Sequence, residues 1–227
     1  MTTEDIEQAL VPFGLKLRGI VALKPNEVQE YGFSGRSSVA LVGNIGSSFW
    51  AEFIQSPEYI DGASNPLDRW SERIANEIAP GLNAKPVFPS QGPPYLPFQQ
   101  WAKRAEALHQ SPLGLLIHPQ FGLWHAYRFA LLINEHIDQT PAQQDSPCLS
   151  CIDRPCLNTC PVNAISTAGY DVDNCASYLK QNTSADCFQH GCMARFECPT
   201  ARNYRYLDAQ SQFHLEAFIG ARLGAGE

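Results

Sequence analysis

The sequence predicts an α+β protein, with a mixed α/β domain over residues 1–140 and a small cysteine-rich domain over residues 141–227. Three observations lead to this division. Before residue 138, short apolar runs typical of strands alternate with segments of helical periodicity. All eight cysteines of the 227-residue chain lie between Cys148 and Cys198. Between the two halves, residues 138–147 form a polar stretch with two prolines, which is typical of a linker.

Three helices are predicted in the first domain. One begins after Thr2 and Thr3, whose hydroxyls suit a helix start, and ends near Pro12. The clearest helix covers Pro66–Ala79, because its apolar residues recur at helical spacing. The third is expected over Phe98–Leu108.

Four strands are expected in the same domain, from short apolar runs between turn residues. They are Leu15–Leu23, Ser38–Gly43, Ala84–Phe88 and Tyr127–Ile133. Strands that alternate with helices indicate a layered α/β arrangement. In the second domain, short helices should separate the cysteines, one of them at Cys175–Gln181, and a C-terminal helix is expected at Ser211–Arg222.

The cysteines form two groups of four, and each group ends in a Cys-Pro pair. The groups are Cys148, Cys151, Cys156 and Cys160, followed by Cys175, Cys187, Cys192 and Cys198. Two such groups are typical of a bacterial-ferredoxin-type module with two 4Fe–4S clusters, in which the fourth cysteine of each group ligates the other cluster. The predicted ligand sets are therefore Cys148, Cys151, Cys156 and Cys198 for one cluster, and Cys175, Cys187, Cys192 and Cys160 for the other. Two sites of four thiolates use all eight cysteines.

The spacing departs from the common ferredoxin pattern in both groups. Four residues separate Cys151 from Cys156 and Cys187 from Cys192, and five separate Cys192 from Cys198. Two structural zinc sites would also use eight cysteines, but zinc sites seldom carry the Cys-Pro ending. Disulfides are disfavoured because the cysteines crowd into one stretch and no secretion signal precedes them. We prefer the iron–sulfur interpretation, with zinc as the main alternative.

Composition and charge restrict the location and the partners. The segment Met1–Asp5 is acidic and polar, unlike a signal peptide. The longest apolar runs, such as Phe129–Ile133, are too short to span a bilayer. With the need for reduced thiolates, these features predict a cytoplasmic protein that does not associate with membranes. The net charge of −7 disfavours nucleic acid and would suit a basic redox partner protein.

The segment Ser111–Trp124 resembles the CblC-type cobalamin-processing protein. That family carries a His-Pro-x-Phe-Gly-x-Trp segment followed by an arginine; the matching residues are His118, Pro119, Phe121, Gly122, Trp124 and Arg128. The opening Pro12–Gly14 also resembles its N-terminal region. The resemblance implies that a corrinoid (cobalamin) binds in a cleft bordered by Ile117–Arg128. The implied cofactor-binding residues are His118, Phe121, Gly122, Trp124 and Arg128. From the residues alone, packing of His118 beside its neighbours is favoured over a role as cobalt ligand or proton donor.

The chain is also similar to epoxyqueuosine reductase, which joins a modified nitroreductase-like, cobalamin-binding domain to a double 4Fe–4S module. The segment Cys175–Leu179 resembles a cluster-ligand segment of that module. The chain departs from the family at three places. Residues 89–94 lack the acidic proton donor, Leu115–Ile117 replace a Gly-Lys-Asn segment, and no extension like the one that binds tRNA follows the cysteines. Chemistry on tRNA is therefore not expected.

Two functions remain open at this point. An iron–sulfur redox protein, and if an enzyme an oxidoreductase, would pass single electrons through the second domain to a corrinoid or small-molecule substrate in the first. A plain ferredoxin-type electron carrier would instead use a first domain without a cofactor to dock a redox partner protein. No residue is assigned as catalytic. A nicotinamide site is not expected, because no glycine-rich phosphate loop follows a predicted strand.

Overall fold

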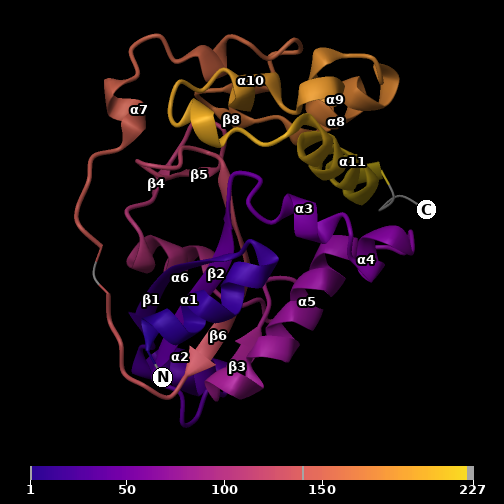
Figure 1. Cartoon of the computed structure of the whole chain (residues 1–227). Helices are drawn as coiled ribbons and strands as arrows, with labels where there is room; N and C mark the ends of the chain where they lie inside the picture. The colour runs from indigo at the N-terminus through magenta and orange to yellow at the C-terminus, as the bar shows by residue number, and fades with distance from the viewer. Residues whose placement is uncertain (1, 140, 224–227) are drawn as a thin grey trace. The chain divides into compact units, whose positions relative to one another are not determined.

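A computed structural model describes residues 2–139 and 141–223 (Figure 1). The chain divides into two compact units. Unit 1 comprises Met1–Ala107 and His125–Gln143, and unit 2 comprises Leu108–Trp124 and Gln144–Glu227. The sequence predicts a single boundary between residues 140 and 141. The observed division differs because Leu108–Trp124 joins the cysteine-rich unit, where Leu113, Ile117 and Leu123 pack into a core with Cys198.

Unit 1 is built on a four-stranded antiparallel sheet with the strand order β1-β2-β6-β3. Its strands are β1 (Lys16–Ala22), β2 (Ser38–Ile45), β6 (His125–Ile133) and β3 (Lys85–Val87). All four predicted strands are confirmed, with somewhat different ends. The strands β2 and β6 approach closely at Gly43, where a Cβ would lie 1.9 Å from the Ala126 carbonyl oxygen. Only glycine fits at that position.

Six α-helices and two 3-10 turns complete the described part of unit 1. They are α1 (Thr3–Leu10), η1 (Val11–Phe13), α2 (Pro25–Tyr31), α3 (Trp50–Phe53), α4 (Pro57–Ile60), α5 (Pro66–Ile78), η2 (Pro80–Leu82) and α6 (Phe98–Ala105). The three predicted helices are confirmed as α1, α5 and α6. Helix α1 starts as expected, because the Thr2 hydroxyl accepts the Asp5 N–H in a capping box. Helix α2 was not predicted, because the residue that it buries is the charged Glu27 and not an apolar one. The Glu27 carboxylate accepts hydrogen bonds from Trp101 and Arg104.

The core of unit 1 is rich in aromatic side chains. Its largest fully buried residues include Trp70, Trp101, Phe49, Phe53 and Phe129. The ring of Phe49 lies 5.6 Å from that of Trp70, which is contact distance for aromatic pairs. These rings explain the apolar stripe of α5, which turns toward the core.

The described part of unit 2 consists of two short hairpins and a set of α-helices and 3-10 turns. The hairpins are β4 (His109–Gln110) with β5 (Leu116–Ile117), and β7 (Ile165–Ser166) with β8 (Gly169–Tyr170). The helices are α7 (Pro147–Ser150), η3 (Pro155–Leu157), α8 (Val172–Gln181), α9 (Asp186–His190), α10 (Met193–Phe196), η4 (Arg202–Tyr204) and α11 (Asp208–Leu223). The two predicted helices are confirmed as α8 and α11, both of which start earlier than expected. The Asp171 carboxylate accepts the Asn174 N–H and caps α8, which explains its earlier start.

None of the helices within residues 2–139 and 141–223 combines the length and the apolar character that crossing a bilayer requires.

Candidate functional site

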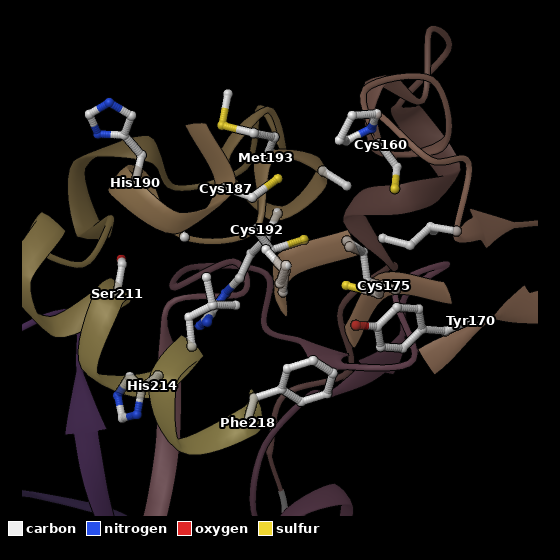
Figure 2. Close-up of a pocket in the computed structure, with 18 of the residues that line it drawn as sticks. Cys160, Tyr170, Cys175, Cys187, His190, Cys192, Met193, Ser211, His214 and Phe218 are labelled. Atoms are coloured by element: carbon white, nitrogen blue, oxygen red, sulfur yellow. The ribbon is translucent and has the colours of Figure 1, made fainter. Parts of the chain in front are cut away.

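A cavity in unit 2 is lined by the cysteines Cys160, Cys175, Cys187 and Cys192, whose sulfurs lie around one space in Figure 2. We call it the second cavity. Its four cysteines are those of the second predicted ligand set, including Cys160, which belongs to the first group in sequence. Helix α8 carries Cys175, α9 carries Cys187, and α10 begins directly after Cys192. The cavity has a volume of about 200 Å³.

A smaller cavity of unit 2, the first cavity, is lined by Cys148, Cys151, Cys156 and Cys198. These are the cysteines of the first predicted set, with Cys198 contributed by the second group. The cavity has a volume of about 20 Å³, and Leu113, Ile117 and Leu123 form part of its wall. Those three residues come from the segment Leu108–Trp124, and all three are buried.

Hydrogen-bond donors point at the sulfurs of the second cavity. The Ala164 N–H donates to Cys160 Sγ at 3.2 Å. The Met193 N–H near Cys187, and the N–H groups of Ala194 and Arg195 near Cys192, oppose the rise that burial causes in the pKa of these thiols. The Tyr170 hydroxyl opposes the rise that burial causes in the pKa of the Cys175 thiol, and Figure 2 shows its oxygen beside that sulfur. In the first cavity the Cys148 N–H donates to the Ser146 hydroxyl at 3.3 Å, and this hydroxyl opposes the rise that burial causes in the pKa of the Cys148 thiol. Donors of this kind stabilise negative charge on sulfur.

Burial raises the pKa of several thiols in both cavities. In the first cavity it raises the pKa of Cys148 and of Cys156. In the second it raises the pKa of Cys175 and Cys187, and that of Cys192 to about 11. Neighbouring thiolates raise these values further, because like charges repel. A cationic group would have to displace these protons in order to gain thiolate ligands.

All eight cysteines are free thiols. The donor set of each cavity, four thiols with N–H or O–H groups directed at sulfur, fits an iron–sulfur cluster in its chemistry. Two further donors flank the second cavity. The atoms Trp124 Nε1 and Arg195 Nε are buried, and no described residue accepts a hydrogen bond from them. In the described part of the chain, no three His, Cys, Asp or Glu side chains lie close enough together to hold a single metal ion.

Four of the five residues that the CblC resemblance assigns to a corrinoid lie in unit 2. His118 is buried, stacks on Phe121 at 4.4 Å, and accepts the N–H of Gln120 at 3.0 Å through Nδ1. This is the packing role favoured from the sequence. Phe121 also packs edge-on against Tyr204 at 5.4 Å.

Gly122 and Trp124 are likewise engaged inside unit 2. Gly122 has a φ of 59°, and a Cβ there would lie 2.6 Å from the Thr200 carbonyl oxygen. Trp124 packs edge-on against Tyr206, and the Arg195 guanidinium lies over both rings, 4.7 and 4.6 Å from their centroids. Of the five residues, Trp124 is the one that lines a cavity described above.

The fifth residue, Arg128, lies in unit 1. Its Nε donates to the Asn44 side chain at 3.1 Å, and its guanidinium lies 5.5 Å from the Phe49 ring centroid. The five residues therefore do not converge on either cysteine cavity. Each has a local contact that accounts for its position, so we derive no chemical step through a corrinoid.

Unit 1 also contains a buried ionic network that the sequence did not reveal. Arg18 donates to both oxygens of Glu106, at 3.0 and 2.9 Å, and to the Asn44 carbonyl at 3.1 Å. The Tyr127 hydroxyl donates to the same carboxylate. Burial raises the pKa of Glu106, while the nearby Arg18 opposes the rise. No local sequence pattern indicates this network, because its members lie far apart in sequence.

Comparison with solved structures identifies a similar fold. An epoxyqueuosine reductase from Streptococcus thermophilus is 16% identical, with a TM-score of 0.51 over 88% of this chain and 66% of that chain. The Bacillus subtilis enzyme is 13% identical, with a TM-score of 0.46 over 90% of this chain and 67% of its own. A reductase bound to an epoxyqueuosine-modified tRNA stem loop is 13% identical, with a TM-score of 0.49 over 91% and 68%.

No protein-family model matches the chain, and no curated protein matches its sequence. The chain spans about two thirds of the length of the Streptococcus thermophilus enzyme. It therefore has an α+β fold similar to that of this epoxyqueuosine reductase.

Proposed function

We propose that the chain is an iron–sulfur electron-transfer protein in which each cavity of unit 2 binds one 4Fe–4S cluster. The observation that carries the proposal is the division of the cysteines. Each cavity holds three cysteines of one group and the fourth of the other. This interleaving is the arrangement that two-cluster ferredoxin modules use. The fold likeness to epoxyqueuosine reductase agrees with it.

Clusters bound at these sites would take up and release single electrons. The chain's own residues would set the conditions for that exchange. The thiolates would hold the irons, and the N–H groups near Cys160, Cys187 and Cys192 would stabilise the negative charge on sulfur. Apolar residues of the walls, such as Leu113 and Ile165, would limit the access of water to the sulfurs. Electrons would come from a redox partner protein in a reducing compartment such as the cytoplasm.

The test is a set of single Cys→Ser substitutions grouped by cavity. Cys198→Ser should match Cys151→Ser, because both residues line the first cavity. Cys160→Ser should match Cys175→Ser, because both line the second. Each variant should lose about four of about eight irons per chain. Electron paramagnetic resonance of the reduced protein identifies which cluster signal is lost.

Two results of this experiment would contradict the proposal. If Cys198→Ser removes the same signal as Cys175→Ser, the ligand sets follow the sequence groups and the interleaved assignment is wrong. If all four variants lose zinc and contain no sulfide, the sites are zinc sites and the electron-transfer function fails.

We further propose that the electron acceptor is a corrinoid or small molecule held by residues of the N-terminal part of the chain, 1–140, with a docked partner protein as the alternative. The support for a corrinoid is the His118–Trp124 segment and Arg128, and the local contacts of those residues weigh against it. Titration of the protein with cob(II)alamin distinguishes a bound corrinoid from a docked partner protein. A changed cobalt resonance supports the corrinoid, and an unchanged one at protein concentrations well above micromolar leaves the partner protein. A tRNA stem loop added in parallel tests the expectation that nucleic acid is not bound, since one reductase of related fold was solved with such RNA.

A further inference from the structure

We propose that the Tyr170 hydroxyl raises the reduction potential of the cluster site in the second cavity by donating a hydrogen bond to Cys175. The inference rests on the proposed function, because it concerns a residue that lines the same cavity. Figure 2 shows the tyrosine ring at the edge of the cavity with its oxygen turned toward the sulfur. Tyr170 would thus be a positioning residue that acts through the ligand Cys175.

The hydroxyl and its acceptor are held by one continuous piece of chain. Tyr170 ends strand β8 and pairs with the buried Ile165 of β7. The next residue, Asp171, donates its N–H to the Ala164 carbonyl at 2.7 Å and caps helix α8. Cys175 lies in the first turns of that helix, where its N–H donates to the Asp171 carbonyl at 3.2 Å. Because hairpin, cap and helix are joined without a loose loop, the hydroxyl is already in place for the sulfur.

Exposure of the tyrosine is consistent with this orientation. The residue is 37% exposed, so part of its ring faces solvent while the hydroxyl faces the cavity. A tyrosine hydroxyl is protonated near neutral pH and can donate to a thiolate. Addition of one electron makes the sulfurs more negative, and a donor to sulfur stabilises the more negative state more strongly. The bond therefore favours reduction at this site.

The first cavity offers a contrast. There the hydroxyl beside a ligand thiol is that of Ser146, which accepts the Cys148 N–H at 3.3 Å. Tyr170 does not line the first cavity. A change at Tyr170 should therefore move one of the two potentials and leave the other in place.

The test is a redox titration of Tyr170→Phe, followed by electron paramagnetic resonance of each cluster. The equilibrium constant for reduction of one cluster should fall about 3- to 10-fold, and tenfold corresponds to 59 mV for a one-electron couple. The matched control is Tyr178→Phe. Tyr178 lines the same cavity and lies on α8. Among the described residues, no hydrogen bond joins its hydroxyl to a cysteine. Both potentials of the control should equal those of the unmodified protein.

Iron and sulfide are measured first, so that the outcomes can be told apart. Absence of both from the unmodified protein defeats the proposed function. Two intact clusters with unchanged potentials in Tyr170→Phe overturn the role of Tyr170 and leave the proposed function standing. If Tyr170→Phe fails to assemble the second cluster, difluorotyrosine is placed at position 170 instead. Its more acidic hydroxyl should raise the same potential, and failure to raise it also overturns the proposal.

Discussion

Replacement of Gly122 by alanine separates two interpretations of the segment that resembles CblC. In the structure Gly122 has a φ of 59° and forms a bridge with His118, in which each N–H donates to the other's carbonyl at 2.8 Å. A Cβ would lie 2.6 Å from the Thr200 carbonyl oxygen, which follows Cys198 and Pro199. The left-handed conformation costs an alanine about 1–2 kcal/mol. The clash adds about 1–3 kcal/mol, because the backbone at Thr200 has to move.

We therefore expect Gly122→Ala to lower the free energy of unfolding by about 2–5 kcal/mol in a denaturant titration. The first cavity should lose iron, because displacement of Thr200 disturbs Cys198. Gly114→Ala is the matched control. Gly114 has a φ of 74° and nothing within 4 Å of a Cβ, so only the backbone cost of about 1–2 kcal/mol applies. Equal effects of the two substitutions would refute the packing argument. Loss of corrinoid binding by Gly122→Ala with unchanged stability and iron content would favour the cofactor role.

Two further predictions concern ion pairs of unit 1. Arg18→Met should lower the free energy of unfolding by about 3–5 kcal/mol at pH 8, because it leaves Glu106 buried without its cation. Burial raises the pKa of Glu106 in the folded state. Glu106 therefore adds to the folding stability below its ordinary pKa of 4.5, and this stability is lost as the pH rises through the folded-state pKa. The destabilisation should therefore shrink toward pH 4.5, and a pH-independent effect in urea titrations would contradict this. The destabilisation caused by Arg73→Gln should also shrink as the pH falls, but only below pH 4.5. The bond from Arg73 lowers the pKa of Glu58, so the stabilisation is present above pH 4.5 and is lost as the pH falls through the folded-state pKa. Because the Arg73 side chain is 42% exposed, the loss at pH 7 should be only about 0.5–1 kcal/mol. Thermal midpoints of the variant should vary less below pH 4.5 than those of the unmodified protein.

The sequence was informative where the signal is local. The stripe of α5 and the apolar run of β2 predict their elements because each is buried on a regular period. The grouping of the cysteines into two interleaved sets follows from two short motifs, although their spacing is irregular. The cap at Thr2 is likewise a matter of three neighbouring residues.

The sequence was uninformative where distant residues meet. Nothing in Leu108–Trp124 indicates that it packs with the cysteine unit, since Leu113 and Ile117 would suit either core. Arg18 and Glu106 are 88 positions apart, so a residue pattern cannot pair them. Helix α2 has a charged buried residue, Glu27, so apolar periodicity overlooks it. Nothing in the sequence marks Tyr170, because only the turn before α8 places its hydroxyl beside Cys175.

The most direct test of the account is the metal and sulfide content of the protein purified without oxygen. The proposed function predicts about eight irons and about eight acid-labile sulfides per chain, with a broad visible absorption that bleaches on reduction. Half that content would mean that only one of the cavities holds a cluster. Stoichiometric zinc with no sulfide would contradict the account, because four thiolates would then hold a single ion in each cavity and no electron could be carried.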